Sequence, residues 1–191
     1  HPHPTLSETL MEAAEVFFGQ NANSSSVPRT NSGTASIAGI VLNGIIERNR
    51  LFGSGSSDAI SLGNPSRNVL ININEISDVT GGIVFTGANL TVRDTNVTNS
   101  SICFAFNRVV NATIDKVRCD NSLIGLRLRA SASEDSYNLN LSNAYFNTSG
   151  ADIRVAAATQ DNVSGLMSIT NTTIATTRNL STPRSNTTHH F

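Results

Sequence analysis

The sequence has no tryptophan, only two tyrosines and two cysteines, and few charged residues. Charged residues make up 14% of the chain, against about a quarter in an ordinary soluble domain. The surface must therefore be built mainly from Asn, Ser and Thr. A formal net charge of −1 also gives no positive field, so binding to nucleic acid or to anionic membranes is not expected.

Long apolar runs are missing as well. No stretch approaches the ~18 residues that a membrane-spanning helix requires. The chain starts with His1 and shows no signal peptide, which indicates a processed mature end or the boundary of an excised piece.

The pattern that is present is a repeat between Asn68 and about Arg178. In each copy, an apolar residue at the fourth position is followed five residues later by another. The copies begin at Asn68, Asn89, Asn111, Asn138 and Leu166. Their apolar pairs are Ile71 and Ile76, Val92 and Val97, Ile114 and Cys119, Leu141 and Phe146, and Ile169 and Ile174. A repeat of this length indicates a solenoid.

A second apolar alternation follows in four copies, at 81–85, 100–106, 122–128 and 151–155. A period of two predicts strands, here two short ones per repeat. Such strands bury no face alone, but stacked repeats enclose a continuous apolar column. We therefore predict an all-β, single-stranded parallel β-helix of about five to seven turns over residues 36–178, with inserted residues in loops.

The two ends of the chain differ from the repeats. Residues 1–35 are predicted to form an arm, with an amphipathic α-helix at 5–18 and a polar linker after it. We expect this helix to cap the first turn, because an open β-helix end exposes apolar core and unpaired backbone. Residues 179–191 form a polar tail, and no helix is predicted to cover the C-terminal end.

The repeats resemble those of right-handed β-helix proteins of the pectin-lyase-like superfamily over roughly residues 36–180. This resemblance rests on repeat length and pattern, and it implies the fold together with a polysaccharide lyase or hydrolase activity. The catalytic sets of that superfamily, acidic clusters for Ca²⁺ with an Arg base or closely set Asp residues with His and Arg-x-Lys, are not found. All four histidines lie at the termini: His1, His3, His189 and His190. We expect no enzyme, no metal site and no cofactor apart from covalent N-glycans.

N-glycosylation sequons are the most frequent chemical motif. They occur eleven times, about twice the number that chance gives for this composition. The asparagines are Asn23, Asn89, Asn96, Asn99, Asn111, Asn140, Asn147, Asn162, Asn171, Asn179 and Asn186. The excess indicates a secreted, glycosylated chain, although Asn and Thr also suit the turns of a β-helix.

Four repeats place an asparagine at the same position, which predicts an internal ladder of stacked side-chain amides. The ladder residues are Asn68, Asn89, Asn111 and Asn138. Asn89 and Asn111 are therefore discounted as glycan sites. Glycans are expected at Asn23, Asn96, Asn99, Asn140, Asn147, Asn162, Asn171, Asn179 and Asn186.

Charged residues also align from repeat to repeat. Arg93 aligns with Asp115 and Asp94 with Lys116, which predicts surface pairing that fixes the register. A small outward basic strip is predicted as well, with two aspartates to neutralise it. The strip is Arg127, Arg129 and Arg154, and the aspartates are Asp120 and Asp152.

The two cysteines, Cys103 and Cys119, suit a secreted chain as one disulfide. The alternation opposes this bond. It places Cys119 inward but Cys103 outward, between inward Ile102 and Phe104, and residues on opposite faces are hard to bridge. The sequence alone leaves the bond open and favours two free thiols.

These features favour a secreted or cell-surface, N-glycosylated structural protein that associates with copies of itself. Filaments or a surface layer would form through its arm, tail and β-helix ends. One alternative is a polysaccharide-binding or polysaccharide-degrading domain, which the lack of Trp and the presence of only Tyr137 and Tyr145 disfavour. The other is a piece of an adhesin or fibre shaft, with further turns beyond residue 191.

Overall fold

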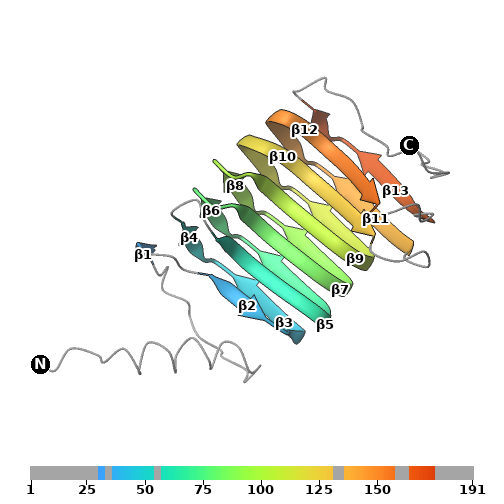
Figure 1. Ribbon diagram of the computed structural model, residues 1–191, viewed down its shortest axis with the longest axis horizontal. Coiled ribbons are helices and arrows are strands. Elements are labelled where there is room, and N and C mark those ends of the chain that lie inside the picture. Colours follow the sequence, from blue (N-terminus) through green and yellow to red (C-terminus); the bar gives the residue numbers. More distant parts are fainter. Residues whose placement is uncertain (1–29, 33–35, 54–56, 131–135, 158–163, 175–191) are drawn as a thin grey trace, which may run out of the picture.

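The computed structural model describes residues 30–32, 36–53, 57–130, 136–157 and 164–174. In these residues the chain is an all-β, parallel β-solenoid of about five turns, and each turn adds one layer of strands to the stack (Figure 1). The described residues contain no helix, and therefore none that is long and apolar enough to cross a membrane. The predicted helix at 5–18 and the tail at 179–191 lie outside the described residues.

The described strands pair only in parallel. In chain order they are β1 (Thr30–Ser32), β2 (Ile37–Gly39), β3 (Leu42–Glu47), β4 (Arg50–Phe52), β5 (Asp58–Asn72), β6 (Glu75–Ser77), β7 (Gly81–Arg93), β8 (Asn96–Thr98), β9 (Ile102–Asp115), β10 (Arg118–Ala130), β11 (Ser136–Ser142), β12 (Tyr145–Ala157), β13 (Ser164–Thr170) and β14 (Thr173–Ile174).

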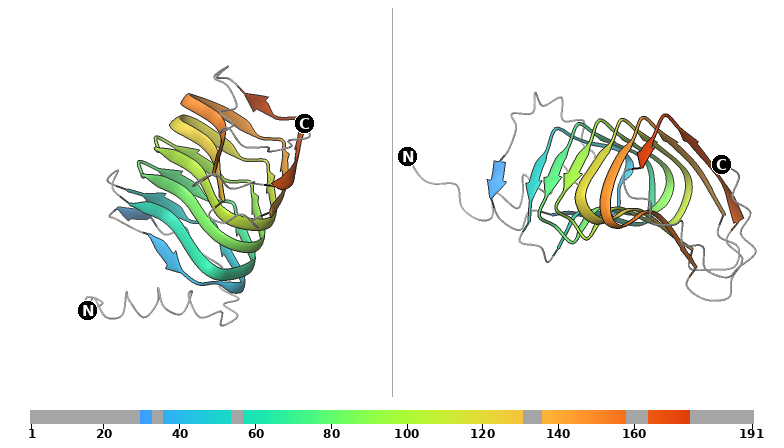
Figure 2. Two further views of the ribbon diagram at one scale, coloured as in Figure 1. Left: turned by 45° about the vertical axis from the view of Figure 1, so that its right-hand side comes forward. Right: turned by 90° about the horizontal axis from the view of Figure 1, so that it is seen from above.

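Each turn has three sides, which are clearest in the turn that starts at Gly81. We call residues 81–86 of this turn the first side, 90–93 the second side and 96–98 the third side, and the same names apply to equivalent residues elsewhere. Strand β7 covers the first two sides and β8 the third, and neighbouring turns wrap in the same way (Figure 2). The sequence pattern predicted two strands per repeat. The turn from Gly81 likewise has two strands, but they form three sides because β7 covers two of them.

The core is a set of columns in which each turn contributes one inward side chain. Ile71, Val92, Ile114 and Leu141 stack on the second side and are at most 1% exposed. Ile76, Val97, Cys119 and Phe146 stack on the third side and are at most 2% exposed. These residues are the first four predicted apolar pairs, which are confirmed as core.

The fifth predicted pair behaves differently. Ile169 is only partly buried, and Ile174 is 46% exposed. Among the described residues, β13 pairs only with β11 and β14 only with β12, so these side chains have a neighbouring turn on one side alone.

The corners between sides are turned by residues in the left-handed conformation, with φ between 44° and 59°. Asn and Asp tolerate this conformation better than other non-glycine residues, which explains their frequency at corners. The first corner uses Asn43, Asn68, Asn89 and Asn111, the second uses Arg48, Ile73, Asp94, Lys116, Asn143 and Asn171, and the third uses Asp78, Asn99 and Asn121.

Small residues line the inside of the third corner, where the chain passes from the third side of one turn to the first side of the next. The strand register aligns Ala59, Gly82, Cys103, Gly125 and Asp152 in this column. A Cβ on Gly125 would lie 2.5 Å from the Asp152 carbonyl oxygen and 2.5 Å from a Phe146 ring carbon. At Gly125, the neighbouring backbone and ring therefore lie too close for a larger side chain.

Strand β1 lies in the segment that was predicted to be a polar linker. It pairs in parallel with β4, with Thr30 opposite Arg50. Its sequence, Thr-Asn-Ser, has no apolar residue, so hydrophobic alternation gave no sign of it.

Candidate functional site

An exposed ladder of side-chain amides runs along the first corner. The Nδ2 group of Asn89 donates to Oδ1 of Asn68 (2.9 Å), Asn111 to Asn89 (3.2 Å) and Asn138 to Asn111 (3.1 Å). Asn68 extends the series by donating to Asn43 (2.6 Å). The predicted ladder is confirmed, but its predicted internal position is wrong. All five side chains are exposed, and Asn43, Asn68, Asn89 and Asn111 are left-handed corner residues that project away from the column of apolar residues.

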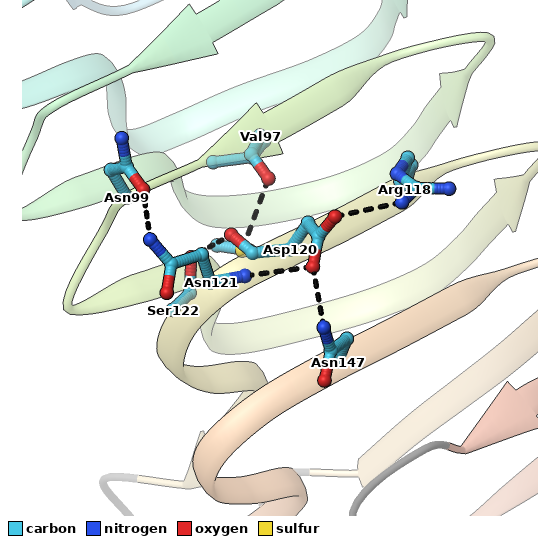
Figure 3. Close-up of polar contacts among 8 residues, drawn as sticks. Val97, Asn99, Arg118, Asp120, Asn121, Ser122 and Asn147 are labelled. Atoms are coloured by element: carbon cyan, nitrogen blue, oxygen red, sulfur yellow. Dashed lines mark hydrogen bonds and ion pairs between the residues drawn. The ribbon is translucent and has the colours of Figure 1, made fainter.

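Shorter ladders at the other two corners were missed by the sequence reasoning. At the second corner, Nδ2 of Asn171 donates to Oδ1 of Asn143 (2.6 Å). At the third corner, Asn121 donates to Asn99 (Figure 3). Asn99 in turn donates to Asp78 (3.2 Å). The signal was available, because these residues recur in the sequence at the spacing of one turn.

The five expected glycan sites in the described residues are all exposed: Asn96, Asn99, Asn140, Asn147 and Asn171. Their amide nitrogens differ in availability. Asn99, Asn147 and Asn171 use Nδ2 to donate to neighbouring turns. Asn96 and Asn140 make no side-chain hydrogen bond to another described residue, so their Nδ2 groups are the more accessible. Asn23, Asn162, Asn179 and Asn186 lie outside the described residues.

Sequons are distributed unevenly around the solenoid. Asn96 and Asn147 lie on the third side and Asn140 on the second, whereas Asn89, Asn99, Asn111 and Asn171 lie at corners. In the described part of the chain, no sequon asparagine lies on the first side. That side carries the three arginines of the predicted basic strip instead.

Two carboxylates on the surface bind neighbouring side chains. Asp120 accepts from Arg118 and from Asn147, both at 2.7 Å, and these bonds lower the pKa of its carboxyl group (Figure 3). Asp115 accepts from Ser142 and Asn143, also at 2.7 Å, and the pKa of this carboxyl group is lowered as well. Both clusters tie one turn to the next.

The predicted charge pairs are only partly correct. Arg93 is the register partner of Asp115, as expected. Its Nε nevertheless donates to Oδ1 of Asn72 (3.1 Å), in the preceding turn, while Asp115 binds the turn that follows. Among the described residues, neither Arg93 with Asp115 nor Asp94 with Lys116 forms a direct ion pair. Arg93 and Asp115 each bind an uncharged neighbour instead.

The predicted basic strip is present, but its predicted neutralising partners are not. Arg127 lies directly opposite Arg154 in the register, and Arg129 is the next outward residue along β10. Asp120 is taken by Arg118, and Asp152 is only 2% exposed and accepts from Thr148 Oγ1 (2.7 Å). Asp152 points inward because it belongs to the third-corner column.

Burial lowers the pKa of the Arg127 guanidinium, and nearby Arg129 and Arg154 act in the same direction, with Asp58 opposing them. The Nε atom of Arg127 is buried without a hydrogen-bond partner in the described residues.

The structure joins Cys103 and Cys119 in a disulfide, with 6.0 Å between their Cα atoms. The argument from alternation, which favoured free thiols, is wrong at this position. Cys103 lies in the third-corner column, where it and the next residue, Phe104, are both fully buried. Strict alternation fails there, so Cys103 and Cys119 both face the interior.

A shallow groove on the second side is lined mostly by amides and hydroxyls, including Asn89, Thr91, Thr113 and Asn140. No group of three or more His, Cys, Asp or Glu residues is arranged to hold a metal ion within the described residues.

Comparison with family models, with curated proteins and with solved structures gave no match. The solenoid fold therefore rests on the structure itself, and the resemblance to the pectin-lyase-like superfamily remains an expectation from repeat pattern alone.

Proposed function

We propose that the protein is an extracellular, N-glycosylated structural solenoid whose copies stack end to end into filaments or a surface layer. The observation that carries the proposal is the state of the two end turns. In the described residues, β2 and β3 pair only with β5, and β13 and β14 pair only with β11 and β12. Within the described residues, each end therefore presents strand edges whose backbone donors and acceptors pair with no further strand, and such edges are templates for another strand.

Exposed apolar side chains accompany these edges. At the first turn, Leu42 is 47% exposed and Ile45 is 61% exposed, and at the last turn Leu166 is 53% exposed. The two ends lie at opposite ends of the stack (Figure 1). Because all strands run in parallel, the last turn of one copy can pair with the first turn of the next in the same register. Such a heterologous contact does not close on itself and generates a filament.

The lateral surface supports the same proposal. The sequons of the described residues lie on the second and third sides and at the corners, where glycans would keep neighbouring stacks apart. Growth would then be directed along the solenoid axis. A piece of a longer adhesin or fibre shaft would have the same two ends, and further repeats in the full-length gene would identify it.

The test is negative-stain electron microscopy of native material together with intact-mass analysis. We expect regular fibres, and a chain mass above the 20.2 kDa of the polypeptide that falls on enzymatic deglycosylation. Peptide mapping should find glycans at Asn96 and Asn140. Discrete particles at the bare polypeptide mass would contradict both parts of the proposal.

Matched variants locate the contact. Ile45→Asp and Leu166→Asp each place a charge at one end, and both are expected to abolish fibres while the circular dichroism spectrum stays that of a β-protein. Val110→Asp alters a residue of a middle turn that is 44% exposed, and fibres should persist. Fibres of normal length from both end variants would rule out stacking through these turns.

A further inference from the structure

The first side of the solenoid carries a charge pattern that the fold does not require. Its outward column runs, turn by turn, through Ala38, Ser61, Val84, Ala105, Arg127 and Arg154. The first four members are small or apolar, and the last two are arginines directly opposite each other. Like charges opposite each other on neighbouring strands are destabilising. When two like charges face each other and no opposite charge neutralises them, the arrangement costs stability. Such a cost is expected at functional sites.

In the described part of the chain, no opposite charge is paired with these arginines. No carboxylate there forms an ion pair with Arg127, Arg129 or Arg154, since Asp120 and Asp152 bind elsewhere. Only Asp58 acts favourably on Arg127, at a distance. The buried Nε of Arg127 also lacks a partner. Arg127, Arg129 and Arg154 therefore form a local cluster of positive charge that no carboxylate of the described residues neutralises by an ion pair.

The geometry of the strands sets the spacing of this site. Neighbouring strands lie about 4.8 Å apart, and successive outward residues of one strand lie about 6.6 Å apart. Arg127, Arg129 and Arg154 therefore form a compact triangle on a flat face. Guanidinium groups bind carboxylates and other oxyanions through paired, charge-assisted hydrogen bonds, so one or two anionic groups over this triangle reach more than one arginine.

We propose that Arg127, Arg129 and Arg154 form a lateral binding site for an acidic polysaccharide, through its sulfate or carboxylate groups. The polymer class rests on the proposed extracellular function, because acidic glycans are the common anionic polymers in that setting. The first side is also the side without sequons in the described residues, so the chain's own glycans would leave it open.

Other anionic polymers fit less well. Duplex DNA is bound through many phosphate contacts that release counterions, and three arginines on a chain of net charge −1 supply few. Single-stranded nucleic acid is held largely by aromatic stacking, and the outward column of the first side has no aromatic residue.

Binding should be measured on immobilised full-length protein at low and at physiological salt. The probes are heparin, which carries sulfate and carboxylate, polygalacturonate, which carries carboxylate alone, neutral dextran and a DNA duplex. We expect salt-sensitive binding to heparin, to polygalacturonate or to both, and none to dextran. The comparison of the two acidic polymers identifies the preferred anion.

The matched variants are Arg127→Gln/Arg154→Gln and the control Arg48→Gln/Arg67→Gln, which removes the same charge from two exposed positions outside the strip. The first is expected to lose at least about tenfold in affinity, since bonds to charged groups are lost, while the control loses less than about threefold. The proposal would be overturned if the native protein bound neither heparin nor polygalacturonate. It would also be overturned if both variants lost the same affinity, or if the protein bound DNA more tightly than the acidic polymers. Fibres are scored separately, so a failed binding test does not affect the stacking proposal.

A second variant tests internal neutralisation by the segment that follows β10. Its sequence contains Glu134 and Asp135, which lie outside the described residues. If the arginines only neutralise these two carboxylates, the native protein should not bind acidic polymers, and binding should be seen only in Glu134→Gln/Asp135→Asn. That result would overturn the proposal. Binding by the unaltered protein supports it.

Discussion

The middle turns and the end turns are built from the same repeat but are stabilised to different extents. In the second-side column, Ile114 is fully buried, whereas Ile169 of the last turn is only partly buried. The difference is the number of neighbouring turns, two for Ile114 and one for Ile169 among the described residues. In a solenoid, stability comes largely from contacts between neighbouring turns, so an end turn has about half of what a middle turn has.

The largest expected effect compares these two isoleucines directly. Ile114→Ala should lower the free energy of unfolding by about 2–5 kcal/mol, because it leaves a cavity between two turns. Ile169→Ala should cost less than half as much, since its site is already open on one side. Chemical denaturation of both variants measures the difference. Equal losses would show that the last turn is covered as fully as the middle ones.

The amide ladder provides a smaller comparison. Asn111 bonds to a neighbour on both sides, whereas Asn171 donates to Asn143 alone among the described residues. Asn111→Gly keeps the left-handed corner accessible but removes both hydrogen bonds, and should cost about 1–2 kcal/mol. Asn171→Gly should cost about half of that, as judged by thermal unfolding.

Both ladder variants also remove a sequon, so the comparison requires protein produced without glycans. Asn111→Ala serves as the control for backbone conformation. It should cost about 1 kcal/mol more than Asn111→Gly, because alanine is disfavoured in the left-handed region. If the two variants were equally stable, corner conformation would not be the reason for asparagine at this position.

The smallest expected effect is the response to acid. Asp115 and Asp120 bind the following turn and have carboxyl pKa values that are lowered in the folded state. A lowered pKa contributes stability that is fully present above the unfolded value of about 3.9 and is lost as the pH falls through the folded value. Melting temperatures should therefore fall below about pH 4, and the decline should be shallower in Asp115→Asn/Asp120→Asn. An identical pH profile for the variant would mean that these carboxylates do not link the turns.

The sequence predicted the parts of the fold that repeat. Pairs such as Val92 and Val97 recur at a fixed spacing because every turn must fill the same columns. Asn89 and Asn111 recur because the same corner needs a left-handed residue in each turn. Because each turn must fill the same apolar columns and form the same corners, the same residue types recur at a regular spacing. This spacing is visible in the sequence alone.

The features that were missed depend on single corners or on distances between side chains. Cys103 faces inward because the third corner buries consecutive residues, which interrupts the alternation used to place it. Asp120 binds Arg118 rather than the arginine strip because Arg118 lies two residues away on the same strand. Neither fact follows from hydrophobic pattern, since both depend on local three-dimensional geometry.

The position of the disulfide has a consequence for how such a chain can change in length. Cys103 and Cys119 are 16 residues apart, so their bond closes a ring within about one turn of the solenoid. No covalent link between distant turns is present in the described residues, and the noncovalent contacts join only adjacent layers. Duplication or deletion of one whole repeat elsewhere would leave every remaining interface intact. The molecule can therefore be lengthened or shortened by gene rearrangement in steps of one turn, without redesign of its core.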